Sequence, residues 1–125
     1  MSEMLKDIAE KSDEHEYYLA MPEGLSDIGK AAYKKIVRVL ELSNIIDIDY
    51  KIFYSPQEWK DRGELYGLES HLIIVHDGGN ICRFFNLDYA MMDGYIKYEF
   101  MRTELEDSEI YTEQCTNWYS AVYEI

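Results

Sequence analysis

Basic residues are scarce in this sequence. Lysine and arginine together number 12 against 25 aspartates and glutamates, which gives a formal net charge of −13. Such a chain repels the phosphate backbone of nucleic acids, so direct nucleic-acid binding is not expected. Its charge instead favours a protein partner with a basic surface, although the same acidity also serves solubility.

Cysteine and histidine are equally scarce. The two cysteines, Cys82 and Cys115, provide no disulfide framework. The three histidines, at positions 15, 71 and 76, show no spacing typical of metal ligands. We therefore expect no metal site and no cofactor. The cysteines are interpreted as small buried residues, because the neighbouring Glu113 opposes a Cys115 thiolate.

Long hydrophobic runs are also missing. No stretch approaches the roughly 20 apolar residues that a membrane span needs. The acidic start, MSEMLKDIAEK, resembles neither a secretory signal nor a basic transit peptide. We expect a cytoplasmic protein without membrane contact. Hydrophobic residues still make up 47% of the 125 residues, which is enough for one folded domain.

The chain divides into an acidic arm and one domain. Residues 1–23 carry most of their charge as carboxylates and have weak hydrophobic periodicity, so a short helix over 2–12 and a frayed arm both stay open. Residues 24–125 are expected to form a single α+β domain. Its first helix should begin after Ser26, a natural N-cap. Its core face should consist of Ile28, Ala32, Ile36, Val39 and Leu40.

Three segments have the pattern of strands. IIDIDYKIFY, at 45–54, alternates hydrophobic and polar residues and predicts a half-exposed strand. LIIV, at 72–75, is hydrophobic at every position, which predicts a strand in the centre of the sheet. The tail at 109–125 predicts two strands joined around 115–117.

Two further helices are expected between these strands. Ser55, Pro56 and Glu58 have the spacing of a capping box, which predicts a short helix after Ser55. NLDYAMMDGYIKYEFMRTELED, at 86–107, predicts a second long helix. The residues expected to face inward from it are Met92, Tyr95, Ile96, Phe100 and Leu105.

DGGN, at 77–80, is interpreted as a tight hairpin turn, because successive glycines supply positive φ angles. ICRFF, at 81–85, would then pair back as a short strand. The predicted fold is a two-layer α+β sandwich. In it, two main helices pack on one face of a mostly antiparallel sheet of four or five strands.

HDGG also permits a second interpretation, as a binding site at the end of the central strand. The imidazole of His76 would act as a general acid or base, and glycine amides would form an anion nest for a nucleotide or phosphate. The candidate ligand-binding residues are His76, Asp77, Gly78, Gly79, Arg62, Arg83 and Tyr54. The segment lacks the spacing of a Walker loop or a dinucleotide fingerprint, and a simple turn needs the same glycines.

Tyrosine is abundant, with 12 residues in the chain. Its ring provides apolar contact area, and its hydroxyl tolerates partial exposure, so tyrosines and carboxylates together suit contact with a basic protein. Packing in the core or at its edge is the alternative for many of them. The residues expected to bind a partner are Glu104, Glu106, Asp107, Glu109, Tyr111, Glu113 and Trp118.

Four segments carry a resemblance to known proteins. LSDIGKAAYKKIV, FYSPQEWKDRGELYG, LIIVHDGG and TEQCTNWYSAVYEI resemble segments of small, uncharacterised proteins encoded by bacteriophages and prophages. Only the acidic N-terminal arm lies outside the resemblance. Since that group has no assigned activity, the resemblance implies a setting rather than a catalytic role. The setting is that of a small accessory protein made inside an infected bacterium, where such proteins often inhibit host defence or metabolism.

The leading hypothesis is therefore a phage-encoded, non-enzymatic inhibitor. It would press an acidic, tyrosine-rich surface onto a bacterial host protein with a basic surface, such as a nucleic-acid-handling defence component. This would take place in the cytoplasm of the infected host. A protein that binds or hydrolyses a small ligand at HDGG is the alternative, and a homodimer stays open. No complete catalytic signature is present in the sequence, which favours a non-enzymatic role.

Overall fold

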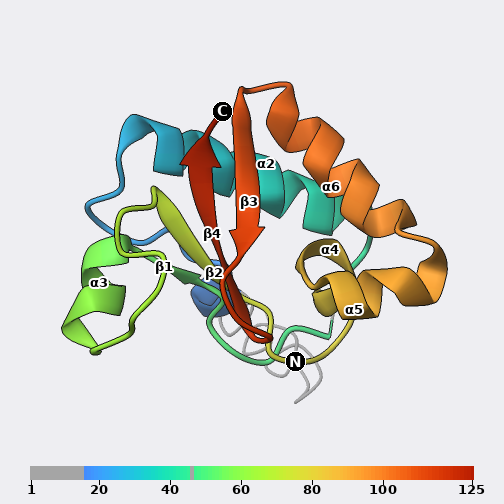
Figure 1. Cartoon of the computed structure of the whole chain (residues 1–125), viewed down its shortest axis with the longest axis horizontal. Helices are drawn as coiled ribbons and strands as arrows, with labels where there is room; N and C mark the ends of the chain where they lie inside the picture. Colours follow the sequence, from blue (N-terminus) through green and yellow to red (C-terminus); the bar gives the residue numbers. More distant parts are fainter. Residues whose placement is uncertain (1–15, 46) are drawn as a thin grey trace, which may run out of the picture.

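The computed structural model describes residues 16–45 and 47–125, so the arm helix considered at 2–12 lies outside it. Figure 1 shows a small sheet with the helix α2 crossing behind it and α6 beside it. The sheet has four strands, all antiparallel to their neighbours, in the order β1-β2-β4-β3. The predicted α+β class with an antiparallel sheet is therefore confirmed.

Helix α2 (Asp27–Leu42) begins where the sequence predicts. The Ser26 hydroxyl accepts a hydrogen bond from the Gly29 amide at 3.1 Å, which satisfies one of the free N–H groups of the first turn. Four of the five residues expected on the core face are buried, and Ile28 is half-buried. The helix thus packs through the predicted face.

Strand β1 (Phe53–Tyr54) is much shorter than the strand predicted at 45–54, so that prediction is wrong in extent. The physical reason lies at Ile52, whose backbone N–H donates to the Tyr18 carbonyl at 3.1 Å. The N-terminal segment thus takes a hydrogen bond that a longer sheet would need. Ile48 and Ile52 are still buried, as the alternation predicts, and Ile46 lies outside the described residues.

Helix α3 (Pro56–Asp61) starts with the predicted capping box. The Ser55 hydroxyl accepts from the Glu58 amide, and the Glu58 carboxylate accepts from the Ser55 amide, both at 3.1 Å. Its Trp59 is completely buried. The capping box thus fixes the start of a helix that carries one large core side chain.

Strand β2 (Leu72–Val75) is buried at every position and lies between β1 and β4. Its predicted central place is confirmed. Strands β3 (Ile110–Gln114) and β4 (Tyr119–Glu124) form the predicted C-terminal pair.

The segment after β2 corrects two predictions. Residues Cys82–Phe85 form the helix α4, not a strand, and 77–80 does not connect a hairpin. Both edges of β2 are already paired, with β1 on one side and β4 on the other, so no edge is left for a returning strand. Phe84 and Phe85 are buried in the core instead.

The long helix predicted at 86–107 is broken. The chain forms α5 (Leu87–Ala90), the 3-10 helix η1 (Met91–Asp93) and α6 (Ile96–Glu106). Gly94 and Tyr95 have φ angles of 69° and 66°, which ends one helix and resets the phase of the next. Leu105 faces inward as predicted, but the inward placement of the other four residues is wrong, because all are exposed: Met92, Tyr95, Ile96 and Phe100.

The core has two parts, one on each face of the sheet. Leu72 and Ile74 of β2 join the larger cluster with side chains of α2, α4 and α6. Ile73 and Val75 join a smaller cluster with Trp59 of α3. The two main helices share one face as predicted, and α3 covers part of the other. Among the helices in 16–45 and 47–125, none combines the length and hydrophobicity needed to cross a membrane.

Candidate functional site

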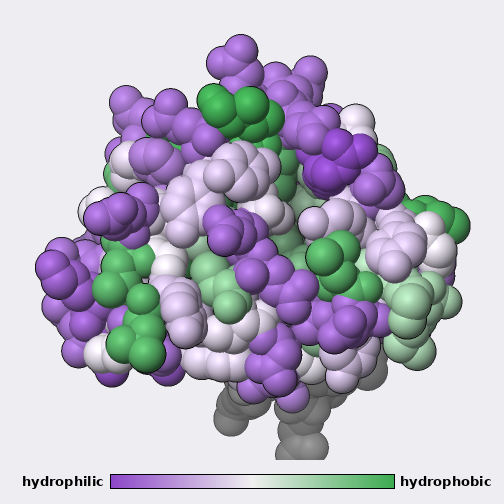
Figure 2. Space-filling model, viewed as in Figure 1, coloured by the Kyte–Doolittle hydropathy of each residue, from purple (hydrophilic) through white to green (hydrophobic). Residues whose placement is uncertain are grey.

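Hydrophobic side chains are exposed along α5, η1 and the start of α6. Met92 and Ile96 have 68% and 72% of their surface exposed. Hydrophobic residues also stand out at the right edge of Figure 2, next to η1 and α6 in the view of Figure 1. We call this set the α5–α6 surface, and it consists of Leu87, Tyr89, Met91, Met92, Tyr95, Ile96 and Phe100. Sequence periodicity missed it, since it placed four of these residues in the core.

Carboxylates predicted to bind a partner continue from this surface along α6. Ile96, Phe100 and Glu104 are spaced four residues apart, so they follow one another on one side of the helix. The end of α6 and the turn after it carry the other predicted carboxylates of this region: Glu106, Asp107 and Glu109. The helix therefore presents hydrophobic side chains first and acidic ones after them.

Some of these charges have partners within the chain. Asp107 lies 3.4 Å from the Lys35 ammonium of α2. Arg102 pairs with both Glu99 and Glu106, and its hydrogen bond lowers the pKa of Glu99. Within the described ranges, Glu104 and Glu109 make no ion pair. Their charges stay available to an external cation.

The remaining predicted partner-binding residues lie on the side of the sheet that carries the smaller core cluster. Tyr111 and Glu113 are exposed on the edge strand β3, two residues apart and hence on the same face of the sheet. Their register partners Tyr123 and Ala121 belong to the smaller core cluster, so both side chains lie on the face of the sheet opposite α6. Trp118 packs against the same cluster, with its ring 5.5 and 4.6 Å from those of Trp59 and Tyr119. The carboxylates of 104–109 are thus separated from the other three predicted residues.

His76 of the HDGG segment is completely buried. Its Nε2 lies 2.8 Å from the Ser120 hydroxyl, and its ring stacks on Phe85 at 5.7 Å. Burial lowers the pKa of His76 to about 4, since the charged form would lose its hydration. The imidazole is therefore neutral and enclosed, and a ligand at the surface cannot reach it.

The predicted anion nest at the two glycines is occupied by the chain itself. The Asn80 amide donates to the Asp47 carboxylate at 2.9 Å. A Cβ built on Gly79 would come within 2.8 Å of the same carboxylate, so the glycine permits this close contact. Arg83, another predicted ligand-binding residue, faces Asp93 at 4.0 Å. The Asp47 carboxylate thus occupies the place at this turn that an external anion would take.

Three of the predicted ligand-binding residues do come together. Tyr54, Arg62 and Asp77 line a cavity of about 330 Å³, whose other lining residues are Tyr50, Lys51, Val75 and Trp118. The Arg62 guanidinium lies 4.5 Å from the Trp59 ring centroid and 3.6 Å from the Glu64 carboxylate. Its charge is already engaged by an aromatic face and an acid.

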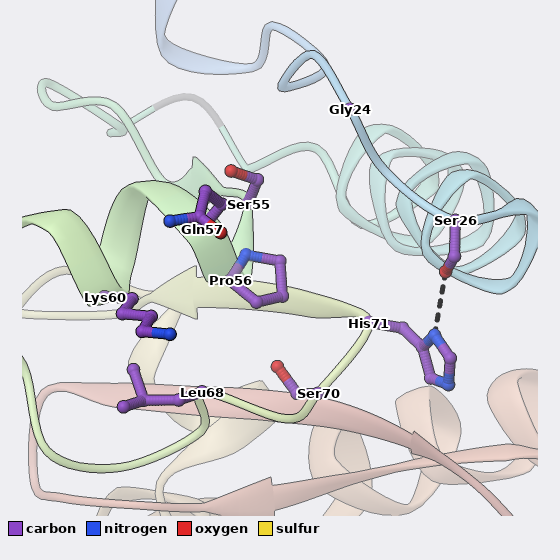
Figure 3. A pocket seen from close by; sticks show the side chains of 9 residues that line it. All are labelled: Gly24, Ser26, Ser55, Pro56, Gln57, Lys60, Leu68, Ser70 and His71. Atoms are coloured by element: carbon purple, nitrogen blue, oxygen red, sulfur yellow. Dashed lines mark hydrogen bonds between the residues drawn. The ribbon is translucent and has the colours of Figure 1, made fainter.

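A second cavity of about 330 Å³ lies between the start of α2 and α3 (Figure 3). Its lining is mostly polar and consists of Gly24, Ser26, Ser55, Pro56, Gln57, Lys60, Leu68, Ser70 and His71. The Ser26 hydroxyl lies 2.7 Å from His71 Nδ1, and His71 Nε2 lies 3.5 Å from the Glu124 carboxylate. Sequence reasoning missed this group because 45 residues separate Ser26 from His71.

Local structure explains how these side chains meet. Ser26 is fixed by its role as the N-cap of α2, and Gly29 leaves room for the helix to lie against the His71 backbone. The His71 amide donates to the Val122 carbonyl at 2.9 Å, which ties it to β4, the strand that carries Glu124. Three separate elements therefore position one cluster.

Neither cysteine has the environment of a reactive thiol. Cys82 is buried and donates to the His76 carbonyl at 2.8 Å, and burial raises its pKa. Burial also raises the pKa of Cys115 to about 11, with a further contribution from Glu113. Among residues 16–45 and 47–125, no three His, Cys, Asp or Glu side chains are grouped so as to hold a metal ion.

The regions described above offer different chemistry to a ligand. The α5–α6 surface offers hydrophobic anchors beside carboxylates, the Tyr54 cavity offers aromatic walls, and the Ser26 cavity offers a hydroxyl beside an imidazole. No family model, curated protein or solved structure matches the chain.

Proposed function

We propose that the protein acts by binding another protein through the α5–α6 surface and the carboxylates that follow it. The exposure of this surface is the observation that carries the proposal. Single exposed hydrophobic residues are ordinary, but a group of seven on consecutive short elements is typical of a contact site. Water contact with these side chains would be removed when a partner covers them.

Helix α6 combines the two features that protein interfaces use. Ile96 and Phe100 supply exposed anchors for a pocket on the partner, and the nearby methionines Met91 and Met92 adapt to its shape. Glu104 and Glu109, whose charges have no ion pair among the described residues, lie beyond these anchors toward the C-terminal end of α6 and the turn after it. The result is a hydrophobic surface with acidic residues at one end.

The partner expected from this chemistry has a basic surface around a hydrophobic pocket. The net charge of −13 would attract such a surface over long range and speed association. The same charge disfavours nucleic acid as the direct ligand. It also disfavours a second copy of this chain, because both copies would carry it.

The resemblance to bacteriophage and prophage proteins supplies the proposed setting. We infer a partner from the bacterial host, met in the cytoplasm of the infected cell. A protein that handles nucleic acid, as many defence components do, has the basic groove that this acidic surface would occupy. Occupying the groove would inhibit the host protein without any chemical step.

Capture from a host lysate followed by binding measurements with the purified partner tests the proposal. We expect the dissociation constant to rise at least tenfold between low and high salt, because screening weakens the attraction. Reversing Glu104 and Glu109 to lysine should weaken binding further. Each single reversal is compared with Glu23→Lys, which makes the same change of charge at an exposed position elsewhere. Binding that is unaffected by salt and by both reversals would contradict the electrostatic part.

A small-ligand site is the second candidate, favoured by the cavity at Tyr54, Arg62 and Asp77. Its aromatic walls would suit a nucleotide base. To bind a phosphate, Lys51 and Arg62 would have to give up their ion pairs with Glu58 and Glu64. A thermal-shift screen against nucleotides tests this candidate. A stabilisation that Arg62→Ala abolishes would support it, and the absence of any shift would count against it.

A further inference from the structure

We propose that Ser26, His71 and Glu124 form an acyl-transfer site, in which they act as nucleophile, base and orienting carboxylate. The inference goes beyond the proposed binding function, since it concerns other residues. Ser26 Oγ lies 2.7 Å from His71 Nδ1, within hydrogen-bonding distance. His71 Nε2 lies 3.5 Å from Glu124, so a carboxylate faces the nitrogen opposite the serine.

Helix capping alone does not require this arrangement, as a comparison within the same cavity shows. Ser26 and Ser55 both cap helices, each accepting an amide hydrogen bond of 3.1 Å, and both line the cavity in Figure 3. Only Ser26 has an imidazole beside its hydroxyl. Because the cap uses an oxygen lone pair, the Ser26 proton is free to point at His71 Nδ1.

The start of α2 would stabilise the charge that develops during the reaction. Its 16 residues give the helix dipole a positive end at Ser26. The Gly29 N–H already donates to Ser26 Oγ, so the N–H groups of Asp27 and Ile28 would be the donors to an oxyanion. The nucleophile thus lies where developing negative charge is favoured.

The expected substrate is a small ester with a polar or anionic acyl group. The cavity of about 330 Å³ is lined mostly by polar groups, among them Gln57, Ser70 and the Lys60 ammonium. Leu68 is one of its few apolar contacts. A long hydrocarbon chain would therefore fit poorly.

The proposed reaction has two halves. Ser26 Oγ attacks the ester carbonyl carbon while its proton passes to His71 Nδ1, and the bond to the alcohol then breaks as the alcohol oxygen takes that proton. Water next attacks the acyl-serine ester with His71 as base, which releases the carboxylic acid and restores the Ser26 hydroxyl. Glu124 stabilises the imidazolium in each half.

Labelling with a fluorophosphonate probe, followed by peptide mass spectrometry, tests the site. We expect modification at Ser26 in the folded protein and none at Ser55 or Ser70. Ser26→Asn keeps a good helix cap and should lose the label while the thermal melt stays near that of the wild type. His71→Asn should slow labelling of Ser26 by at least about 100-fold.

Hydrolysis of nitrophenyl acetate gives a second readout. Glu124→Gln should lower kcat with KM nearly unchanged, since Glu124 orients the base and does not touch the ester. Nitrophenyl octanoate should be a much poorer substrate than the acetate. The proposal is overturned if Ser26 is labelled no faster than Ser55 in the folded protein. It is equally overturned if His71→Asn reacts like the wild type, and Ser26 is then only a helix cap.

Discussion

Gly29, in the first turn of α2, lies directly against the backbone carbonyl of His71. A Cβ built on Gly29 would come within 2.3 Å of that oxygen, far inside van der Waals contact. Glycine inside a helix costs about 1 kcal/mol relative to alanine, so its presence here has a packing reason. The contact sets how closely Ser26 can approach the His71 ring.

Gly29→Ala should therefore destabilise the protein, although alanine is the better helix former. We expect a loss of about 1–3 kcal/mol in the free energy of unfolding, because α2 must move away from His71 to admit the methyl group. Urea unfolding measures the change. Lys30→Ala, at the exposed neighbouring position, is the control and should change stability by less than about 0.5 kcal/mol. If Gly29→Ala were as stable as the wild type, α2 could move away from His71 without cost, which would contradict this prediction.

Stability should fall as the pH drops from 6.5 to 4, because of His76. Burial lowers its pKa from the ordinary value of 6.5 to about 4, so in this window the unfolded chain binds the proton more readily than the folded one. Stability is then fully present above pH 6.5 and is lost as the pH falls. The loss amounts to about 3 kcal/mol by pH 4, measured by urea unfolding at several pH values.

His76→Gln separates this effect from the titration of carboxylates. Glutamine can still hydrogen-bond the Ser120 hydroxyl, but it has no charge to gain. The pH dependence of its stability between 6.5 and 5 should be clearly flatter than that of the wild type. Parallel curves for the two proteins would show that folding does not lower the pKa of His76.

Both thiols should react slowly in the folded protein. Burial raises the pKa of Cys115 to about 11 and also raises that of Cys82, so little thiolate exists at pH 8. Reaction with a disulfide reagent should be on the order of 100-fold slower than in urea. Cys82→Ala isolates the half-exposed Cys115. Fast native labelling of that variant would contradict the assigned environment.

Local chemistry predicts the helix starts and the central strand correctly. Ser26 and Ser55 each bind an amide three residues later, and that interaction depends only on nearby sequence. The four hydrophobic residues at 72–75 are all buried, since only an inner strand covered on both faces suits such a run. These features do not depend on distant parts of the chain.

The errors arise where distant segments decide the outcome. Residues 81–85 form α4 because β1 and β4 already occupy both edges of β2, which no local pattern reveals. In 86–107, the positive φ angles of Gly94 and Tyr95 reset the helical phase, so Met101 faces inward and Phe100 does not. A prediction that assumes one uninterrupted helical period across this segment cannot reveal the break.

The candidate sites follow the same division. Glu104 and Asp107 could be proposed for partner binding because acidic character is visible in the sequence itself. The sequence pattern predicts a core position for four of the exposed hydrophobic residues beside them, and only the broken helix shows otherwise. Ser26 and His71 meet through tertiary folding alone.

Binding of the captured partner by Ile96→Ser, compared with Leu42→Ser, tests the central claim most directly. Ile96 and Leu42 are similarly exposed, at 72% and 67%, but Leu42 lies at the end of α2, outside the α5–α6 surface. Burying an isoleucine is worth about 1.5–3 kcal/mol, so Ile96→Ser should raise the dissociation constant of the complex roughly 10- to 100-fold. Leu42→Ser should leave it within about twofold, and both proteins should melt like the wild type. Unchanged affinity in Ile96→Ser would contradict the proposal that α6 anchors the partner.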